Sequence, residues 1–503
     1  MKQSIVLCIL LISFLLAGCG RKIFTGKREA RGVWMSRFEY ANKDPEVSKQ
    51  KIRTVFERAR TARFNMVFFQ VRGNGDAFYK SSYEPWAASL TDSLGKDPGW
   101  DPLEFAVGEA HRLGLEIHAW TNVFPYWRGP ALPPSSEPPQ PYRAHPEWIV
   151  CDKDGKPMSV NPPANDYIWA SPGIPAVRQH VRNVVMDIVN HYDIDGIHFD
   201  YVRYPEGSPV KGYSHDSVSI ARFGSPEGNP EKLAWDHWQR EQVNQFVIEA
   251  YNDITAAKPW VKVSASVIGK YMGTGWTSYN AVYQDPRRWM EVGKIDFIVP
   301  MVYWERSHPT HPFIPLITQW QDRVAYDRQV LPGLATRLID KYGYGEIEAE
   351  IRETRRLGLP GVVFFSAGGL QKAWETLGVN EFPYWSLIPQ MPWKDSTAPP
   401  PPLNVAAHVQ GNALSLQWNL PSSDKPLSFV IYRSTIPEVS RDDVFAIADV
   451  TGRNATSYVD DHYAEWDSDV LYYMVTSVDR LGNESAPTPV VTVRPRAATV
   501  SLK

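Results

Sequence analysis

The chain lacks an excess of basic residues, and this limits the partners that it can have. Its 503 residues include 53 Lys and Arg and 56 Asp and Glu, so its formal net charge is −3. No run of basic residues interrupts this balance. Nucleic acids and acidic membrane surfaces are bound mainly by clustered positive charge, so we expect neither to be the main partner.

The apolar run at the N-terminus is too short to cross a membrane. It extends over residues 5–16 after Lys2 and has the length of the apolar part of a signal peptide. It ends in the tetrapeptide "LAGC" at 16–19, which resembles the lipoprotein box of bacteria. The resemblance implies that residues 1–18 are removed and that Cys19 carries lipid, with several acyl chains as a stable membrane anchor. An ordinary secretory signal or an uncleaved helix is the alternative.

Cysteine is scarce, with three residues in the chain. Cys8 lies in the predicted signal peptide and Cys19 at the predicted lipidation site, so only Cys151 remains and no intramolecular disulfide can form. By resemblance to lipoproteins of Gram-negative bacteria, the absence of Asp after Cys19 argues against retention in the inner membrane. We therefore expect a lipid-anchored protein of the outer membrane that faces the periplasm.

Strand-like apolar stretches alternate with amphipathic helical stretches through the first three quarters of the chain. This alternation is typical of parallel sheets, and eight βα units match a (β/α)8 barrel, which we place at residues 29–390. A doubly wound open sheet is the alternative, but no glycine-rich phosphate-binding motif follows the first strand. The eight predicted strands are 31–36, 66–72, 115–122, 194–202, 261–267, 295–304, 329–336 and 361–367.

Two further segments stand out by composition. Residues 125–175, after the third strand, form a long insertion rich in Pro, Trp and Tyr, and loops in this position build the active-site face of a barrel. A proline-rich linker at 391–402 is expected to be stiff and extended, and short alternating strands follow at 403–496. Trp418 and the stretch "VTSVDRLGNES" resemble a fibronectin type III domain, a small all-β sandwich. We expect it to act as a spacer or to contact protein or glycan.

Side-chain alternation divides each barrel strand into a set facing the helices and a set facing the lumen. In the fourth strand, Ile197, Phe199 and Tyr201 form the outward set, which leaves His198 and Asp200 inward. Other strands also place polar groups inward near their carboxyl ends, where barrel active sites lie. The inward residues of the second, third and sixth strands are Gln70, Arg72, His118, Trp120, Asn122, Met301, Tyr303 and Glu305.

Two carboxylates end strands at this face. Asp200 ends the fourth strand and Glu305 follows the sixth. A pair of carboxylates flanking a lumen suits glycosidic bond cleavage, in which one acid protonates the leaving oxygen and the other is nucleophile or base. Asp193 and Asp195 lie at the opposite end of the fourth strand, so we interpret them as capping and turn residues. Reserve candidates on loops are Asp76, Glu206 and Asp285.

Four segments together resemble the glycosyl-hydrolase-like family 10 of bacterial lipoproteins. They are "EARGVWMSRF" at 29–38, "NMVFFQVRGNGDAFYKSSYEPW" at 65–86, "WASPGIPAVRQHV" at 169–181 and "DGIHFDYVRYP" at 195–205. The resemblance implies a TIM-barrel glycoside hydrolase with Asp200 as nucleophile and Glu305 as acid. It also implies action on peptidoglycan glycan strands, particularly strands stripped of peptides.

The fourth strand also resembles the "DxxDxDxE" strand of family 18 chitinases. In those enzymes the final Glu is the acid of a substrate-assisted mechanism. Val202 occupies that position here, so the mechanism lacks its proton donor at the usual place.

The sequence therefore predicts a glycoside hydrolase acting on a cell-envelope polysaccharide. Its 19 Trp and 24 Tyr suit the stacking of rings on sugar faces. No cofactor or metal is expected, because the His and Asp residues lack a close ligand spacing. A carbohydrate-binding lipoprotein without catalysis and a structural envelope protein are the alternatives. Residues expected to position the sugar are Arg72, His118, Asn122, His198, Tyr201, Arg203, Tyr303 and Trp304.

Overall fold

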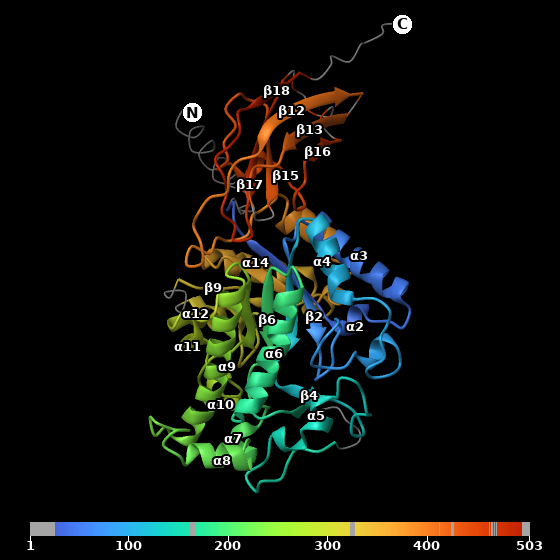
Figure 1. The fold of residues 1–503 in the computed structure, drawn as a ribbon. Coiled ribbons are helices and arrows are strands. Elements are labelled where there is room, and N and C mark those ends of the chain that lie inside the picture. The colour runs from blue at the N-terminus through green and yellow to red at the C-terminus, as the bar shows by residue number, and fades with distance from the viewer. Residues whose placement is uncertain are drawn as a thin grey trace, which may run out of the picture.

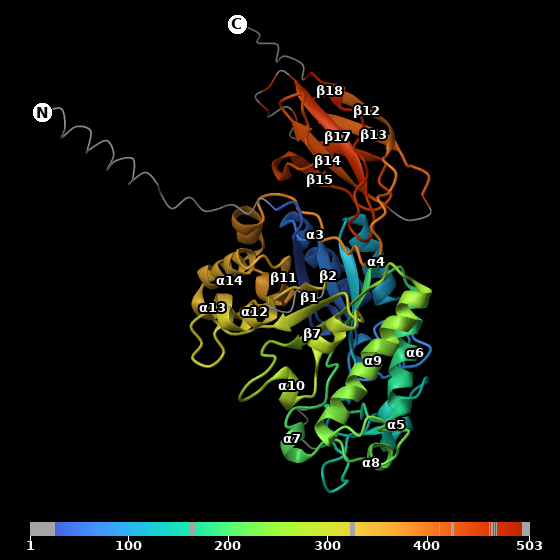
Figure 2. The same cartoon turned by 90° about the vertical axis from the view of Figure 1, so that its left-hand side faces the viewer.

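The computed structural model describes residues 26–494, except for 161–166, 322–326, 412, 424–426, 462, 464–465, 467 and 469. The predicted signal peptide and Cys19 lie outside the described residues. No helix in the described ranges is long and apolar enough to cross a membrane. The chain forms a barrel surrounded by helices, with a small β-structure beyond one end of it (Figures 1 and 2).

The predicted (β/α)8 barrel is confirmed. One sheet has the strand order β10-β11-β1-β2-β3-β6-β7-β8-β9, and β10 also pairs with β8, which closes it. Since β9 and β10 are separated only by Leu331 and Pro332 and both contact β8, they share one strand position of the eight. The strands are β1 (Ala30–Met35), β2 (Met66–Arg72), β3 (Glu116–Asn122), β6 (Gly196–Asp200), β7 (Lys262–Ile268), β8 (Phe297–Met301), β9 (Gln329–Val330), β10 (Gly333–Ala335) and β11 (Gly361–Phe365).

Helices between successive strands cover the outside of the barrel (Figure 1). Three of them, α3, α4 and α11, begin with Asp-Pro, where Asp44, Asp101 and Asp285 accept hydrogen bonds from backbone N–H groups of the first turn. Proline suits the next position, whose N–H has no partner within a helix. The helices that follow strands are α2 (Arg37–Tyr40), α3 (Pro45–Thr61), α4 (Pro102–Arg112), α6 (Pro175–His191), α9 (Trp235–Ala257), α11 (Pro286–Glu291), α12 (Phe313–Gln321), α13 (Arg337–Tyr342), α14 (Tyr344–Arg356) and α15 (Trp374–Thr376).

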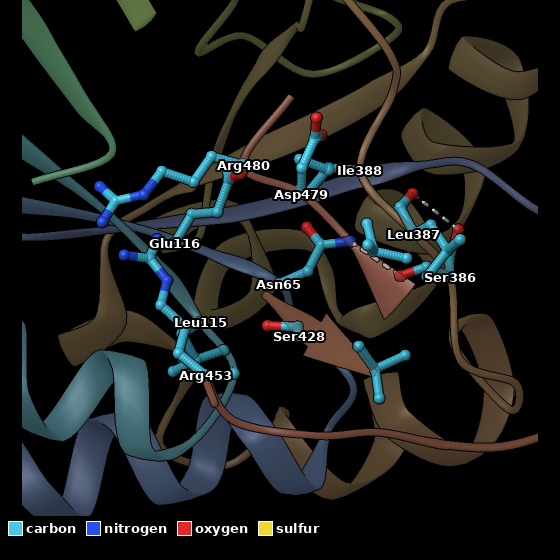
Figure 3. A pocket seen from close by; sticks show the side chains of 13 residues that line it. Asn65, Leu115, Glu116, Ser386, Leu387, Ile388, Ser428, Arg453, Asp479 and Arg480 are labelled. Atoms are coloured by element: carbon cyan, nitrogen blue, oxygen red, sulfur yellow. Dashed lines mark hydrogen bonds between the residues drawn. The ribbon is translucent and has the colours of Figure 1, made fainter. Parts of the chain in front are cut away.

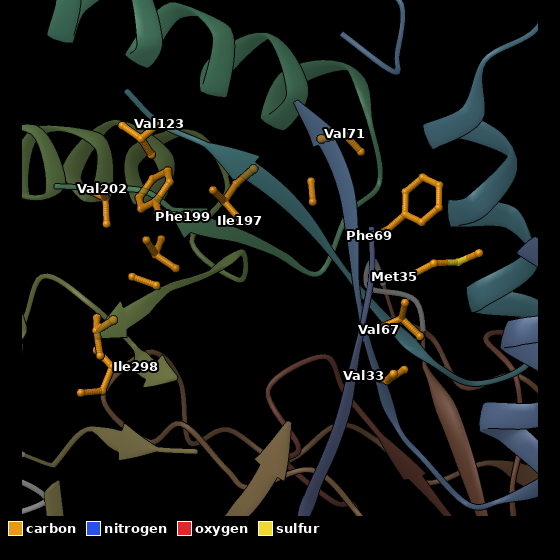
Figure 4. Packing of buried hydrophobic residues seen from close by; sticks show 14 of the residues in the cluster. Val33, Met35, Val67, Phe69, Val71, Val123, Ile197, Phe199, Val202 and Ile298 are labelled. Atoms are coloured by element: carbon orange, nitrogen blue, oxygen red, sulfur yellow. The ribbon is translucent and has the colours of Figure 1, made fainter. Parts of the chain in front are cut away.

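The predicted alternation along the strands is observed for most positions. Val67, Phe69, Ile197 and Phe199 lie in the apolar layer between the strands and the helices (Figure 4). A separate cluster fills the lumen with Trp34, Met66, Phe68, Trp120, Phe297, Val299 and Val363. The lumen is therefore a packed core, and a binding site can form only at its ends.

Gly196 shows how closely the lumen is packed. A Cβ atom at Gly196 would lie 2.1 Å from Nδ1 of His118 on the neighbouring strand. His118 is itself fully buried and contacts the rings of Phe68 and Phe297, with ring centroids 4.9 and 5.6 Å apart. The glycine in β6 is thus required by the imidazole beside it.

Loops after the strands carry short elements at the carboxyl end of the barrel. The long insertion after β3 contains the two-stranded sheet of β4 and β5, and further short helices surround it (Figure 1). These elements are β4 (Pro125–Trp127), α5 (Pro141–Ala144), β5 (Ile168–Trp169), α7 (Ser208–Lys211), α8 (Ser217–Phe223) and α10 (Ser278–Ala281).

The C-terminal region forms two antiparallel sheets, as expected for a small β-sandwich. One sheet has the order β12-β13-β16 and the other β15-β14-β17-β18. Leu416, Trp418, Phe429 and Val475 are among the buried residues of its core. The strands are β12 (Leu403–Gln410), β13 (Ala413–Asn419), β14 (Ser428–Ser434), β15 (Ile447–Val450), β16 (Ser457–Asp460), β17 (Leu471–Val478) and β18 (Val491–Val493).

The linker before the sandwich is packed on the barrel. Trp393 Nε1 donates to Asp296 Oδ1 at 2.8 Å, and Lys394 Nζ lies 3.1 Å from Asp296 Oδ2. Met391 is buried in the lumen cluster at the amino end of the strands. The expectation of an extended proline-rich linker therefore applies only to the part after these contacts.

The sandwich covers the amino end of the barrel, opposite the loops that follow the strands (Figure 1). Asp195 has a fully buried side chain that forms an ion pair with Arg453 of the sandwich and lies 3.1 Å from His111 Nε2. Asp193 lies 2.5 Å from Arg480. A cavity of about 70 Å³ at this interface is lined by residues of both domains (Figure 3).

The nearby cations keep the carboxyl group of Asp195 ionised. Burial alone would raise the pKa of Asp195, but Arg453, His111 and Arg480 together hold it well below its ordinary value. Its Oδ2 also accepts the N–H of Ile117 at 3.0 Å. Asp195 is thus a structural residue, although its role is that of a buried ion pair and not the capping or turn role that the sequence indicated, and the sandwich supplies its counter-charge.

We predict that Arg453→Met destabilises the protein. Arg453 is the closest cation to the buried carboxylate of Asp195, and its removal leaves only His111 at 3.1 Å and Arg480 at 4.0 Å. Weakening a buried ion pair in this way costs about 3 kcal/mol of unfolding free energy. The matched control is Arg352→Met, which breaks an exposed pair with Glu348 and should cost less than about 0.5 kcal/mol. Urea denaturation at pH 7 measures both. Equal losses would contradict the role of Asp195.

Candidate active site

A cavity of about 270 Å³ opens at the carboxyl ends of β1, β2, β3, β6, β7, β8 and β11. It therefore lies where barrel active sites lie. Among its lining side chains, all of them in the described part of the chain, Asp200 is the only carboxylate. The lining residues are Trp34, Ser36, Arg37, Phe38, Gln70, Trp120, Asn122, Tyr167, Asp200, Tyr201, Arg203, Ser266, Met301, Tyr303 and Phe365.

Asp200 is the last residue of β6 and is 7% exposed. Its Oδ1 accepts the backbone N–H of Tyr201 at 2.7 Å, and its backbone carbonyl accepts the N–H of Val123 at 2.8 Å. Burial raises the pKa of Asp200 to about 6, although the guanidinium of Arg203 acts to lower it. A carboxyl group with this pKa can exist in both protonation states near neutral pH, which suits acid–base or nucleophilic chemistry.

Tyr201 breaks the strand alternation. Its backbone φ is +51°, in the left-handed region that side chains other than glycine rarely adopt. The change of direction brings Tyr201 to the pocket wall, whereas alternation predicted that it would face the helices; that part of the prediction is wrong. A backbone of this kind costs on the order of 1 kcal/mol, and such residues cluster at functional sites.

The amide of Asn122 lies beside Asp200, because these two residues are paired across β3 and β6. Its Oδ1 accepts hydrogen bonds from Trp120 Nε1 at 3.1 Å and from Gln70 Nε2 at 3.2 Å. Its Nδ2 is buried and has no hydrogen-bond partner among the described residues. Asn122 therefore presents a fixed donor to the pocket that a sugar hydroxyl can accept.

Aromatic rings form the pocket walls. Tyr303 and Phe365 stack with ring centroids 5.4 Å apart, and Phe365 is 38% exposed. Phe38 is 69% exposed and lies under the guanidinium of Arg37. Tyr167, from the insertion after β3, packs against Tyr201 in a T-shaped arrangement, with ring centroids 5.3 Å apart. Exposed rings around a polar floor suit the apolar faces of sugars.

The buried histidine of β6 does not reach the pocket. His198 is fully buried, and Trp34 Nε1 donates to its Nε2 at 3.1 Å. Ser264 and Ser266 each lie 2.8 Å from a ring nitrogen, and burial holds the pKa of His198 well below its ordinary value. His198 is thus a neutral support beneath the pocket, which corrects the expectation that it positions the sugar.

Two further predicted sugar ligands are buried away from the pocket. His118 is fully buried deeper in the lumen. Arg72 donates from Nε and Nη2 to the carboxylate of Glu84 at 2.7 and 2.6 Å, because the pairing of β2 with β3 shifts register after Gln70. This irregularity turns Arg72 out of the lumen.

The loop after β8 contains the remaining predicted residues. Tyr303 lines the pocket, but Trp304 stacks on His311, with ring centroids 4.7 Å apart, and neither Trp304 nor Glu305 is a lining residue. A hydrogen bond with its own backbone, followed by one with Tyr342, lowers the pKa of Glu305. The structure therefore does not bring Glu305 across to Asp200.

The reserve candidates also have other positions. Asp285 caps α11 and accepts the hydroxyl of Tyr271 at 2.7 Å. Asp76 accepts the N–H of Asn74 at 2.7 Å, and Glu206 is exposed. In the described ranges, no group of three His, Cys, Asp or Glu residues is placed to hold a metal ion.

Besides Asp200, four residues predicted from the sequence to position the sugar line the pocket, namely Asn122, Tyr201, Arg203 and Tyr303. Gln70, Trp120 and Met301 were assigned to the lumen but not to the site. Alternation along β1 could have identified Trp34 as a lumen residue, but Arg37 and Phe38 follow that strand on a short helix. Tyr167 comes from a distant insertion, and no local pattern indicates that it reaches Tyr201.

The sequence matches a known protein family and is similar to two named bacterial proteins. A sequence model described as glycosyl hydrolase-like 10 matches residues 29–346, more than half of the chain. The chain is 28% identical to the glycosyl hydrolase YngK of Bacillus subtilis over 490 residues, which cover 91% of this chain and 92% of YngK. It is 28% identical to the glycosyl hydrolase DigH of Escherichia coli (strain K12) over 331 residues, which cover 58% of this chain and 70% of DigH.

Among solved structures, the chain is similar to the PgaB (BpsB) glycoside hydrolase domain from Bordetella bronchiseptica. The TM-score is 0.48 at 13% sequence identity, and the match covers 70% of this chain and 98% of that domain.

We predict that Asp200→Asn stabilises the protein above pH 6 and not at pH 4. The raised pKa means that the folded state favours the protonated carboxyl, so ionisation removes stability as the pH rises from about 4 through about 6. Asparagine cannot ionise, so it removes this loss, which amounts to roughly 1–3 kcal/mol of unfolding free energy at pH 8. Urea denaturation at pH 4 and pH 8 measures the difference. A loss of stability at pH 8 would contradict a desolvated carboxylate.

Proposed function

We propose that this chain, which belongs to the glycosyl hydrolase-like 10 family, hydrolyses glycosidic bonds of a cell-envelope polysaccharide in the pocket around Asp200. The observation that carries the proposal is the position of this carboxyl group. It is buried at the carboxyl end of a barrel strand, with a pKa raised to about 6, among aromatic rings and donors that have no partner within the described ranges. These are the elements needed to bind a sugar and attack its anomeric carbon.

The substrate that we propose is the glycan strand of peptidoglycan. The resemblance of segments such as 195–205 to lipoprotein hydrolases supports it, together with the "LAGC" box. On this proposal Cys19 carries the lipid anchor and the enzyme faces the periplasm from the outer membrane. The sandwich, which resembles a fibronectin type III domain, covers the amino end of the barrel and leaves the pocket end free for a long polymer (Figure 2).

In the proposed reaction, Asp200 acts in its ionised form as nucleophile or general base. The N–H of Tyr201 holds Oδ1 of the carboxylate, so the other oxygen is the one available for attack or for a water. Asn122 Nδ2 binds a hydroxyl of the sugar at this position. Stacking on Tyr303 and Phe365 orients the ring.

The proposed general acid is Glu305. Glu305 belongs to the loop after β8 whose first residues line the pocket, so a turn of this loop would bring its carboxyl toward the leaving oxygen. In the structure it is partly buried outside the pocket lining, and its lowered pKa works against proton donation. Catalysis by Glu305 therefore requires that the loop carry it toward Asp200 when substrate binds.

Carbohydrate binding without catalysis is a second candidate function, and the set of side chains that line the pocket favours it. Among the described residues, a single carboxylate lines the pocket, whereas hydrolysis by a carboxylate pair needs two. A carbohydrate-binding lipoprotein without catalysis would keep the aromatic walls and Asn122 and would not need Glu305. Cleavage of a glycan by the wild-type protein separates the two functions.

We predict that the wild-type protein cleaves purified peptide-free glycan strands and that Asp200→Asn lowers the rate by roughly 10³-fold or more. If Glu305 is the acid, Glu305→Gln lowers it by about 10²-fold or more. The matched control is Glu375→Gln, an exposed residue on α15, which should be unaffected. Mass spectrometry of the products, on these strands and on intact peptidoglycan, measures each rate. An unchanged rate removes the corresponding residue from the mechanism.

The pH dependence tests the state of Asp200. If the ionised form reacts, kcat/KM should rise with pH and level off above about 6, because the carboxyl group loses its proton there. The measurement is a pH profile of kcat/KM on soluble glycan oligosaccharides. A profile that falls through pH 6 would instead assign Asp200 as the proton donor.

A further inference from the structure

Arg203 is a buried cation that has no polar partner in the part of the chain that the structure describes. It lines the pocket three residues after Asp200 and is 5% exposed. Its Nε and Nη1 atoms are buried and have no hydrogen-bond partner among the described residues. No ion pair joins it to a carboxylate within the described ranges, although its charge acts on the pKa of Asp200.

The other buried arginines of the barrel are paired. Arg72 meets Glu84 through two hydrogen bonds, and Arg31 donates to Glu29 at 2.8 Å. Arg37, the other arginine of the pocket, donates to Asn74 Oδ1 at 3.1 Å. Arg203 is thus an exception to a rule that this barrel otherwise follows.

The surroundings hold the guanidinium in place. It lies 4.8 Å from the ring centroid of Tyr201 and 5.6 Å from that of Trp169. The backbone is fixed on both sides, because Gln284 Nε2 donates to the carbonyl of Val202 at 3.3 Å and the N–H of Tyr204 donates to Val282 at 3.0 Å. Arg203 is therefore positioned before any ligand arrives.

A buried guanidinium without an acceptor is costly, and a ligand that supplies the acceptor recovers this cost. The planar N–H pattern of arginine matches the two oxygens of a carboxylate. The lining side chains carry the charges of Arg37, Arg203 and Asp200, which leave one positive charge when Asp200 is ionised. A singly charged carboxylate balances this charge, whereas a phosphate would bring a second negative charge beside Asp200.

We propose that Arg203 binds a carboxylate carried by the sugar chain next to the bond that Asp200 attacks. The pocket would thereby select acidic glycans over neutral ones of the same length. This proposal rests on the proposed function only for the position of the scissile bond, since recognition of the carboxylate concerns binding alone.

The test is a binding measurement in a background that cannot turn over substrate. Asp200→Asn is titrated with GlcNAc–MurNAc oligosaccharides from peptide-free strands and with the same oligosaccharides after reduction of their carboxyl groups to alcohols, by tryptophan fluorescence. We expect roughly 10- to 100-fold tighter binding of the carboxylate form, as for hydrogen bonds to charged groups.

Adding Arg203→Met to this background should abolish the difference between the two forms, and Arg203→Lys should keep part of it. The matched control is Arg58→Met, which replaces an exposed arginine of α3 and should leave the difference intact. Because Asp200 is already neutral in every variant, an effect of Arg203 on its pKa cannot produce this pattern. Thermal denaturation confirms that each variant is folded.

The two proposals fail in different ways. Equal binding of both oligosaccharides by Asp200→Asn, or an unchanged preference after Arg203→Met, overturns the assignment of Arg203 even if the wild-type protein cleaves both. If the preference depends on Arg203 but the wild-type protein cleaves neither oligosaccharide, hydrolysis is refuted and carboxylate recognition stands.

Discussion

The two-residue alternation of parallel strands in a closed barrel is the constraint on which the pocket depends. It forces every second side chain of β6 into a lumen that apolar rings already fill. His198 is accepted there because serine hydroxyls and Trp34 use both of its ring nitrogens. Asp200, one alternation later, passes beyond the packed layers into a cavity, where its carboxyl is desolvated but still reachable. The two-residue alternation along β6 thus places a structural residue, His198, and a residue of the pocket, Asp200, two positions apart.

The two aspartates at the ends of β6 have pKa values shifted in opposite directions. At the amino end, Asp195 is surrounded by cations, and its pKa is held well below the ordinary value. At the carboxyl end, Asp200 has a backbone N–H and a more distant guanidinium, so burial prevails and raises its pKa. The first arrangement stabilises the folded state and joins the barrel to the sandwich. The arrangement at Asp200 lowers the stability of the folded state above pH 6, and it leaves a carboxyl group that can change its protonation state near neutral pH.

Two side chains of the pocket wall keep buried donors without a hydrogen-bond partner in the described part of the chain. Beneath the pocket, the buried polar groups of His198 and Asp195 have partners, whereas Nδ1 of His118 in the lumen has none among the described residues. At the pocket, Asn122 and Arg203 keep N–H groups without acceptors among the described residues. Such groups are costly in a folded protein, and these two belong to residues that line the cavity, where a polar ligand can supply the acceptors. An amide and a guanidinium on either side of Asp200 suit a ligand with hydroxyl and carboxylate oxygens.

The sequence by itself determined the barrel, the sandwich and the position of Asp200, because eight strand-like stretches, their alternation and the family resemblance are local properties of the chain. Only the tertiary structure decided which polar residues reach the pocket. A register shift turned Arg72 toward Glu84, a left-handed backbone brought Tyr201 inward, and the loop after β8 left Glu305 outside the pocket lining. These outcomes depend on contacts between segments far apart in the chain, which alternation along one strand does not contain.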